Sequence, residues 1–224
     1  MRFFKSLLPF NLINLVAMFC VTLTLPEIIP SHMNFKMEVD GYAGRWITMI
    51  FGGASVLISV GILVYWNLTK NIEKFQKNRK VEEIILPLIA ALFIVISWAP
   101  IFMAKAAETL SAATTEHVFY FGLFFTMGLF MLIAGNFMGV IKHNRLLGIR
   151  TPWTLKDETV WKKTHRFGAY TSVIGGIIIC VSAVLGFISK NAALSISGFI
   201  AGMILVAAVP MTYSYVIYKK LHAK

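Results

Sequence analysis

The feature that most constrains the fold of this chain is a set of six long runs of residues. None of these runs contains an Asp, Glu, Lys, Arg or His side chain. They cover residues 6–25, 46–68, 84–104, 118–141, 169–189 and 192–217. Each run has at least 20 residues, the length that an α-helix needs to cross the hydrocarbon core of a bilayer. Because 58% of the residues are hydrophobic and only 14% are charged, the chain is too apolar for an ordinary water-soluble domain. The sequence therefore predicts an all-α integral membrane protein, with six transmembrane helices in a single polytopic domain over residues 1–224.

The distribution of lysine and arginine predicts the orientation of these helices. The termini and the even-numbered loops contain 17 of the 21 Lys and Arg residues, whereas the odd-numbered loops contain four. Cytoplasmic loops carry the excess of basic residues, so both termini are expected in the cytoplasm. The net charge of +11 then reflects topology and contact with anionic membrane lipids. Direct nucleic-acid binding is not expected, since the cytoplasmic loops are too short for a reading domain.

The inner loop 142–168, between the fourth and fifth runs, has the densest polar chemistry of the chain. Pro152 restricts its own φ and disfavours α conformation at Thr151, so a rigid, extended turn is expected after Gly148. Trp153 follows at the level where indole rings sit between headgroups and water. This part of the loop is therefore expected at the membrane interface.

A short helix is expected in the second half of the loop, from residue 155 to about 167. Thr154 is placed to cap it, and Asp157 and Glu158 put negative charge at the positive end of the helix dipole. At 100° per residue, one face carries Val160, Trp161, Thr164 and Phe167. The opposite face carries Glu158, Lys162, Lys163, His165 and Arg166. The pattern predicts an amphipathic interfacial helix whose basic face meets water or a partner.

The outer loop 26–45 is the longest segment expected outside the cell. Pro26 and Pro30 end the first helix, and Asp40-Gly41 indicates a turn. Its polar candidates for contact with an extracellular ligand are Glu27, His32, Asn34, Glu38 and Asp40. Their spacing matches no closed ligand set, so no metal site is predicted. A surface that meets a ligand and a loop that only packs over helix ends both remain open.

Some residues inside the runs are expected to hold the helices together. Asn11 and Asn14 share one helix face and are interpreted as interhelical hydrogen-bonding residues. Pro100 is expected to kink the outer end of the third helix. Gly135-x-x-x-Gly139 and Gly198-x-x-x-Gly202 are candidates for close helix packing. Asn136 is expected to bond across to the inner loop and fix it to the bundle.

Several classes of function are disfavoured by what the runs and loops lack. Ion-coupled transporters need ionisable groups at membrane depth, and no Asp, Glu, Lys, Arg or His lies inside any run. The sequence has no Gly-x-Ser-x-Gly, no His-Glu-x-x-His and no phosphate-binding loop, so no enzyme, catalytic residue or cofactor is predicted. Cys20 and Cys180 lack a Cys-x-x-Cys partner and are interpreted as small packing residues.

Two segments resemble a known family. The run GIRTPWTLKDETVW (148–161), with Gly135-Asn136 and Asn144 before it, is similar to the motif of the SdpI family of bacterial membrane immunity proteins. The segment LPEIIPSHMNFKMEVDGYAGRW (25–46) resembles a Pro-Xaa-Xaa-Xaa-Pro-Xaa-His segment in the amino-terminal half of many relatives. Together with the hydropathy pattern, these motifs cover most of the chain.

The resemblance implies resistance to a secreted, SdpC-like peptide toxin that attacks the bacterial cell membrane. It also implies that some relatives draw an ArsR-type transcriptional repressor to the membrane once toxin is sensed. The candidate residues at the inner face, for the repressor or for structure, are Asn136, Asn144, Gly148, Arg150, Thr151, Pro152, Trp153, Thr154, Asp157, Glu158, Trp161, Lys162, Lys163, His165 and Arg166.

Two alternatives remain at this point. In the first, Arg150, Thr151, Pro152 and Trp153 only anchor a turn at the membrane interface. In the second, the chain is a small uncoupled permease or exporter subunit. A permease needs a substrate path, which Asn11, Asn14, Ser97 and Asn136 would line if they faced one water-filled cavity.

Overall fold

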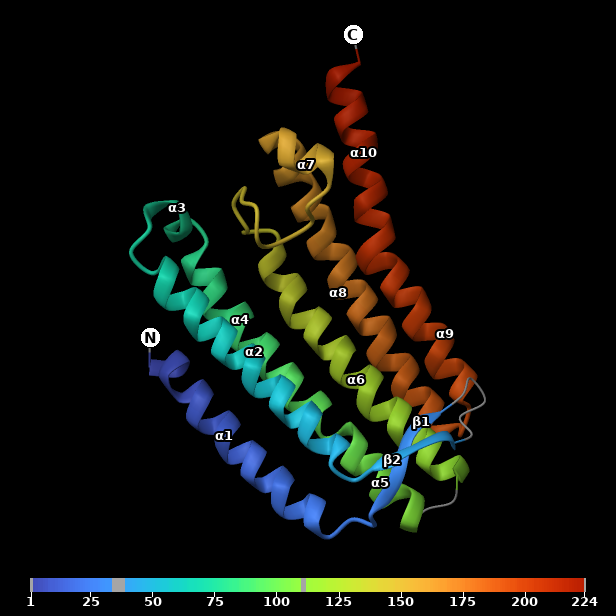
Figure 1. Ribbon diagram of the computed structural model, residues 1–224. Coiled ribbons are helices and arrows are strands. Elements are labelled where there is room, and N and C mark those ends of the chain that lie inside the picture. Colours follow the sequence, from blue (N-terminus) through green and yellow to red (C-terminus); the bar gives the residue numbers. More distant parts are fainter. Residues whose placement is uncertain (1, 34–38, 110–111, 224) are drawn as a thin grey trace. The chain divides into compact units, whose positions relative to one another are not determined.

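A computed structural model describes residues 2–33, 39–109 and 112–223. These residues form helices and one small antiparallel hairpin (Figure 1). In chain order the elements are α1 (Arg2–Leu23), β1 (Ile28–Met33), β2 (Val39–Gly44), α2 (Ile47–Thr69), α3 (Glu73–Gln76), α4 (Arg79–Ser97), α5 (Ala99–Thr109), α6 (Ala112–Met138), α7 (Pro152–Lys156), α8 (Glu158–Ile188), α9 (Ala192–Met203), a π-helical turn η1 (Ile204–Ala208) and α10 (Val209–His222).

Six candidate membrane spans occur among the described residues, one for each apolar run of the sequence. They are Ser6–Leu23, Ile47–Thr69, Arg79–Glu108, Glu116–Met138, Glu158–Ile188 and Ala192–His222. Large apolar side chains point outward from these helices, for example Leu57, which is 71% exposed, and Ile188, which is 72% exposed. Such a surface is unfavourable in water and suited to lipid. The chain is therefore a multi-pass membrane protein.

The third and sixth spans are each interrupted next to a proline. Between α4 and α5 the helix breaks at Trp98, two residues before Pro100, which has no N–H for the helical ladder. This interruption lies beside Pro100, where the sequence predicts a kink. In the sixth span, the π-helical turn η1 precedes Pro210. A π-helical turn shifts the hydrogen-bond pattern by one residue and so accommodates a ring that would clash in a regular helix.

The chain divides into two compact units. The first unit comprises residues 1–76 and 82–119, and the second comprises residues 77–81 and 120–224. In the first unit, one apolar cluster contains Leu7, Ile62, Trp66, Leu86 and Ala90, and another contains Met18, Leu25, Ile29, Ile101 and Ala104. α1 and α2 are packed together in this unit.

Buried asparagines join the helices of the first unit, as the sequence predicts. Asn11 of α1 donates from Nδ2 to the Ser59 Oγ at 2.8 Å, and its Oδ1 accepts from the Ser55 Oγ at 2.9 Å. Asn14 accepts from the Trp98 Nε1–H at 2.7 Å. These side chains are therefore satisfied by protein partners, which is the usual role of a polar residue in a membrane helix.

The outer segment forms a hairpin, which the sequence analysis did not predict. β1 and β2 pair antiparallel, with Pro30 opposite Tyr42, and Asp40-Gly41 lies inside β2 instead of at a turn. Pro30 and the two glycines of β2 are poor strand formers, so no strand pattern was visible. The Arg45 Nη1 donates to the Leu25 carbonyl at 2.9 Å, which fixes the end of the hairpin to the end of α1.

Small residues bring the helices of the second unit close together. A Cβ placed on Gly135 of α6 would lie 2.8 Å from the Ser172 Cβ of α8. A Cβ on Gly202 of α9 would lie 2.4 Å from the Ile179 Cγ1 of α8. The packing role expected for the two Gly-x-x-x-Gly pairs is confirmed at these positions, because any side chain there would separate the helices.

Candidate functional site

The candidate site is the inner loop and the first turns of α8, all in the second unit. The loop begins at a clamp made by Asn78, which is buried. Its Nδ2 donates to the Lys142 carbonyl at 2.9 Å and its Oδ1 accepts from the Lys142 N–H at 2.7 Å. Sequence reasoning missed Asn78, because no local pattern connects residues 64 positions apart.

Asn144 shapes the next turn through its own side chain. Its Oδ1 accepts from the backbone N–H groups of Leu146 and Leu147, both at 2.7 Å. Its Nδ2 donates to the carbonyls of Lys142 and Leu147 at 2.8 and 3.1 Å. This is the turn-forming use of an asparagine side chain, which replaces backbone pairing. Asn144 is therefore a scaffold residue here.

Gly148 and His165 fit each other at the centre of the loop. Gly148 has φ +104°, and a Cβ built on it would lie 2.1 Å from the His165 Nε2. Next to it, the Ile149 N–H donates to that Nε2 at 3.0 Å. The His165 Nδ1 lies 2.9 Å from the Trp161 carbonyl. A backbone N–H can only donate and a carbonyl can only accept, so the ring is neutral with its proton on Nδ1.

Trp161 is the largest buried side chain of this site. Its ring stacks on His165 with centroids 3.9 Å apart, and His143 meets it edge-on at 5.0 Å. The Trp161 Nε1–H donates to the Ile141 carbonyl at 2.8 Å. Both Trp161 and His165 are 0% exposed. The two rings form the core on which the inner loop is folded.

The burial of His165 corrects the sequence-based assignment. A helical wheel places His165 on the basic face with Lys162 and Lys163, but its ring is directed into the space left by Gly148. A wheel describes one helix only and cannot show that a segment 16 residues away covers this position. On the apolar face of the wheel, Val160, Trp161 and Thr164 are buried and Phe167 is half-buried.

The two helix starts also differ from the prediction. Thr151, in extended conformation as expected, caps α7 and accepts from the Thr154 N–H at 3.2 Å. Thr154 is not the cap; its Oγ1 accepts from the Thr151 N–H at 2.9 Å and so completes a capping box. The Thr151 Oγ1 also lies 3.0 Å from the Ser214 Oγ of α10. Pro152 occupies the first turn of α7, where its missing N–H costs nothing.

Asp157 caps α8, which is one continuous helix instead of a separate interfacial helix followed by a span. Its Oδ1 accepts from the N–H groups of Thr159 and Val160 at 2.6 and 3.0 Å. These bonds, that from Val160 first, lower the pKa of Asp157 below its ordinary value of 3.8, and the nearby His222 adds to the effect. The His222 Nε2 lies 3.5 Å from the Asp157 Oδ2.

The basic face of α8 is exposed near its start. Lys162, Lys163 and Arg166 all point outward. The Lys162 Nζ lies 3.0 Å from the Glu158 Oε1, at the predicted helical spacing. This face is thus shared by one ion pair and two further cations, Lys163 and Arg166.

The remaining inner candidates lie around this core. Trp153 packs against Tyr215 of α10 with ring centroids 5.0 Å apart. The Arg150 Nη1 donates to the Arg145 carbonyl at 2.9 Å. Asn136 is exposed, and its Nδ2 donates to the Leu132 carbonyl of its own helix at 3.0 Å. The bond expected from Asn136 to the inner loop is therefore not formed within the described residues, and Asn78 provides the clamp instead.

The outer candidates are only partly described. His32 and Asp40 face each other across the hairpin, with Nδ1 and Oδ1 2.5 Å apart, and both are exposed. Glu27 is exposed at the start of the hairpin. Asn34 and Glu38 lie outside the described residues. Within the part of the chain that the structure describes, no group of three His, Cys, Asp or Glu side chains is arranged to hold a metal.

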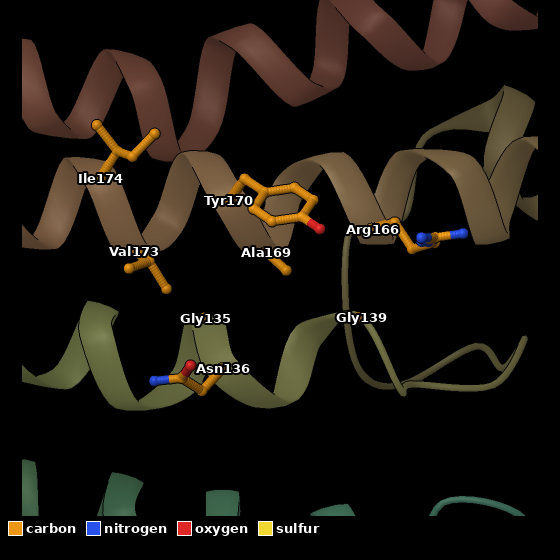
Figure 2. A pocket seen from close by; sticks show the side chains of 8 residues that line it. All are labelled: Gly135, Asn136, Gly139, Arg166, Ala169, Tyr170, Val173 and Ile174. Carbon is orange, nitrogen blue, oxygen red and sulfur yellow. The ribbon is translucent and has the colours of Figure 1, made fainter.

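A groove opens between α6 and α8 on the second unit (Figure 2). Its volume is about 600 Å³. It is lined by Gly135, Asn136 and Gly139 of the α6 end and by Arg166, Ala169, Tyr170, Val173 and Ile174 of α8. Figure 2 shows Ala169 and Val173 directed towards α6, with Arg166 at one end of the groove. The groove therefore combines apolar walls with a cationic end.

A comparison with known protein families finds a match at the inner loop. The model of the SdpI/YfhL protein family matches residues 140–214, the segment that contains the inner loop, α7, α8 and most of the last span. Residues 140–214 are therefore similar to the SdpI/YfhL family. The resemblance noted for the run 148–161 is thereby confirmed.

The SdpI/YfhL segment also has a named relative. The chain is 43% identical over 96 residues to the immunity protein SdpI of Bacillus subtilis (strain 168). The similarity covers 43% of this chain and 44% of the relative, so the chain matches less than half of the relative's length. No solved structure matches the chain. The buried Trp161–His165 core described above lies inside the SdpI/YfhL segment.

Proposed function

We propose that this chain is a membrane immunity protein that protects a bacterial cell from a secreted, SdpC-like peptide toxin. The observation that carries the proposal is the SdpI/YfhL match over residues 140–214, together with 43% identity over 96 residues to a protein named for immunity. That relative is not named as an enzyme, and the polar groups of the inner loop bond mainly to one another. Non-enzymatic protection at the membrane is the function that these observations support best.

The proposed orientation puts the termini, the inner loop and α7 in the cytoplasm. Its support is the excess of Lys and Arg at the termini and in the even-numbered loops, 17 of 21. In this orientation the hairpin β1–β2 lies outside the cell. A toxin that arrives from outside then meets the hairpin first.

The outer hairpin offers an apolar surface for a peptide. Ile28 and Tyr42 are each 66% exposed on it. Next to it is an apolar pocket of about 190 Å³, lined by residues that include Pro30, Phe51 and Met103. Exposed aromatic and aliphatic side chains beside a pocket are typical of protein–peptide contacts. We assign the toxin contact to this hairpin, with Glu27, His32 and Asp40 at its polar rim.

A signalling role is proposed for the cytoplasmic face. Lys162 and Lys163 are adjacent and exposed on α8, and a cationic surface attracts an acidic partner. An ArsR-type repressor that docks here would be held away from its DNA. Toxin would change this docking only if it bound two packings of the protein with different affinity. Double charge reversal, Lys162→Glu with Lys163→Glu, should then abolish repressor capture while membrane insertion persists.

The permease alternative has less support. Asn11, Asn14 and Ser97, which would line a substrate path, are buried in the first unit. Each has a protein partner: Asn11 bonds to serines of α2, Asn14 to Trp98 and Ser97 to the Ile94 carbonyl at 2.6 Å. Polar groups engaged in this way are not presented to a passing solute.

The proposal is tested by survival of a toxin-sensitive bacterium with and without this chain. Cells are challenged with an SdpC-type peptide and, separately, with an unrelated pore-forming peptide. Protection against the first peptide alone is expected. Equal killing by the SdpC-type peptide with and without the chain, when membrane insertion has been confirmed by immunoblot, would exclude immunity to this toxin.

A further inference from the structure

The groove between α6 and α8 remains open because small residues form its floor. Gly139 and Ala169 face each other there, and a Cβ built on Gly139 would lie 3.7 Å from the Ala169 Cβ. This is ordinary van der Waals distance, so an alanine would fit at Gly139 without moving the backbone. Val173 and Ile174 continue the groove as apolar walls. The space is therefore suited to a hydrocarbon chain.

The cationic end of the groove is available to an anion. Arg166 is exposed, and no carboxylate of the described residues forms an ion pair with it. The second unit contains two acidic residues, Asp157 and Glu158. Asp157 caps α8 and lies beside His222, and Glu158 pairs with Lys162. Within the described residues of the second unit, no carboxylate is therefore left to pair with Arg166.

Two more polar groups line the groove. Tyr170, 66% exposed, lies one turn after Arg166 on α8, with its hydroxyl directed towards Arg166, whereas Asn136 of α6 lies further from Arg166, towards Val173 (Figure 2). A guanidinium with a neighbouring hydroxyl group matches the oxygens of a phosphate, which arginine binds through two parallel hydrogen bonds. These groups lie at the sides of the groove and leave its floor apolar.

The direction of the groove distinguishes a lipid from a free anion. Both α6 and α8 are candidate membrane spans, so the groove follows a membrane-crossing helix. Arg166 lies three residues before the uncharged run that begins at Ala169, and Ile174 lies about 12 Å further along the helix at 1.5 Å per residue. An anionic head at Arg166 would therefore be at the interface and its chain would lie in the hydrocarbon.

We propose that this groove binds one anionic phospholipid, with its phosphate at Arg166 and one acyl chain over Gly139, Ala169 and Val173. The site shares no residue with the outer hairpin or with the Lys162–Lys163 pair, and it does not depend on the immunity proposal. A bound lipid would link the cytoplasmic end of α6 to α8 beside the inner loop. Its occupancy would thus stabilise the segment on which the SdpI/YfhL motif lies.

The test measures lipid binding to the purified full-length chain by native mass spectrometry from detergent. The probes are dioleoylphosphatidylglycerol, dioleoylphosphatidylcholine and glycerol 3-phosphate. One phosphatidylglycerol is expected to bind at least tenfold more tightly than phosphatidylcholine or glycerol 3-phosphate. Equal affinity for the two lipids would contradict the role of Arg166, and equal affinity for glycerol 3-phosphate would show a phosphate site without an acyl groove; either result overturns the proposal.

Two pairs of variants test the phosphate contact and the acyl-chain contact of the lipid separately. Arg166→Gln should weaken phosphatidylglycerol binding at least tenfold, whereas Lys220→Gln, which removes a cation from α10, should change it less than twofold. Gly139→Leu should fill the floor and weaken binding similarly, whereas Gly122→Leu adds the same side chain to α6 where nothing lies within 4 Å of a Cβ. If Arg166→Gln does not fold, the comparison of Gly139→Leu with Gly122→Leu still tests the proposal. Unchanged binding in Gly139→Leu would overturn the proposal.

Discussion

At the scale of single residues, the inner loop depends on a glycine and a histidine that fit together. Pro152 and Thr151 behave as the sequence predicts, because proline restricts its neighbours through local geometry. His165 does not, because its burial depends on the void beside Gly148. The conformation of the turn can therefore be predicted from the local sequence. The burial of the His165 ring beside it is visible only in the fold.

Gly148→Ala tests this fit. The native φ of +104° is strained for alanine, and its Cβ would lie 2.1 Å from the His165 Nε2. The substitution should lower the free energy of unfolding by about 2–4 kcal/mol, from backbone strain and a lost hydrogen bond. Thermal unfolding of the purified protein in detergent measures it. Gly122→Ala, in open space on α6, is the matched control and should be neutral or slightly stabilising; equal melting of the two variants would refute the fit.

At the scale of elements, α8 is longer than the sequence suggested because its polar start and its apolar run form one helix. The charged residues end near residue 168, but the end of the charged segment marks the membrane surface and not the end of a helix. The six runs themselves were found because length and hydropathy suffice for spans. The hairpin was missed because its strands contain proline and glycine.

The Asp157 cap stabilises the start of α8 and makes the stability of the fold depend on pH. Asp157→Ala should destabilise the protein by about 1 kcal/mol at pH 7, since two N–H groups lose their acceptor. The folded-state pKa of Asp157 is lowered from 3.8, so the carboxylate stabilises the fold above the unfolded-state pKa. This contribution disappears as pH falls through the folded pKa, below 3.8. Melting curves of both proteins should therefore converge in that acidic range; a constant difference at all pH values would contradict the capping role.

A second prediction at this scale concerns the outer hairpin as the contact surface for the toxin. Tyr42→Asp places a charge on the surface assigned to the toxin and should reduce protection at least fourfold, measured as the minimum inhibitory concentration of the SdpC-type peptide. Tyr42→Phe keeps the ring and should retain protection. If Tyr42→Asp protects as well as the wild type at equal membrane level, the hairpin is not the contact surface.

At the scale of the whole molecule, the proposed topology follows from the asymmetry of basic residues. Green fluorescent protein fused after Lys77 or Lys224 should fluoresce, because it folds in the cytoplasm. Alkaline phosphatase fused after Lys105 or Lys190 should be active, because it is active only outside. The reverse pattern at any of these sites would show that basic residues do not set the orientation of this chain.

The central claim is that this chain protects the membrane itself from an SdpC-like peptide. The most direct measurement is the membrane potential of toxin-sensitive cells, followed with a potential-sensitive dye after peptide is added. Cells that carry the chain should keep their potential against the SdpC-type peptide and lose it against an unrelated pore-forming peptide. Equal loss of potential with and without the inserted chain, when the SdpC-type peptide is added, would contradict the account.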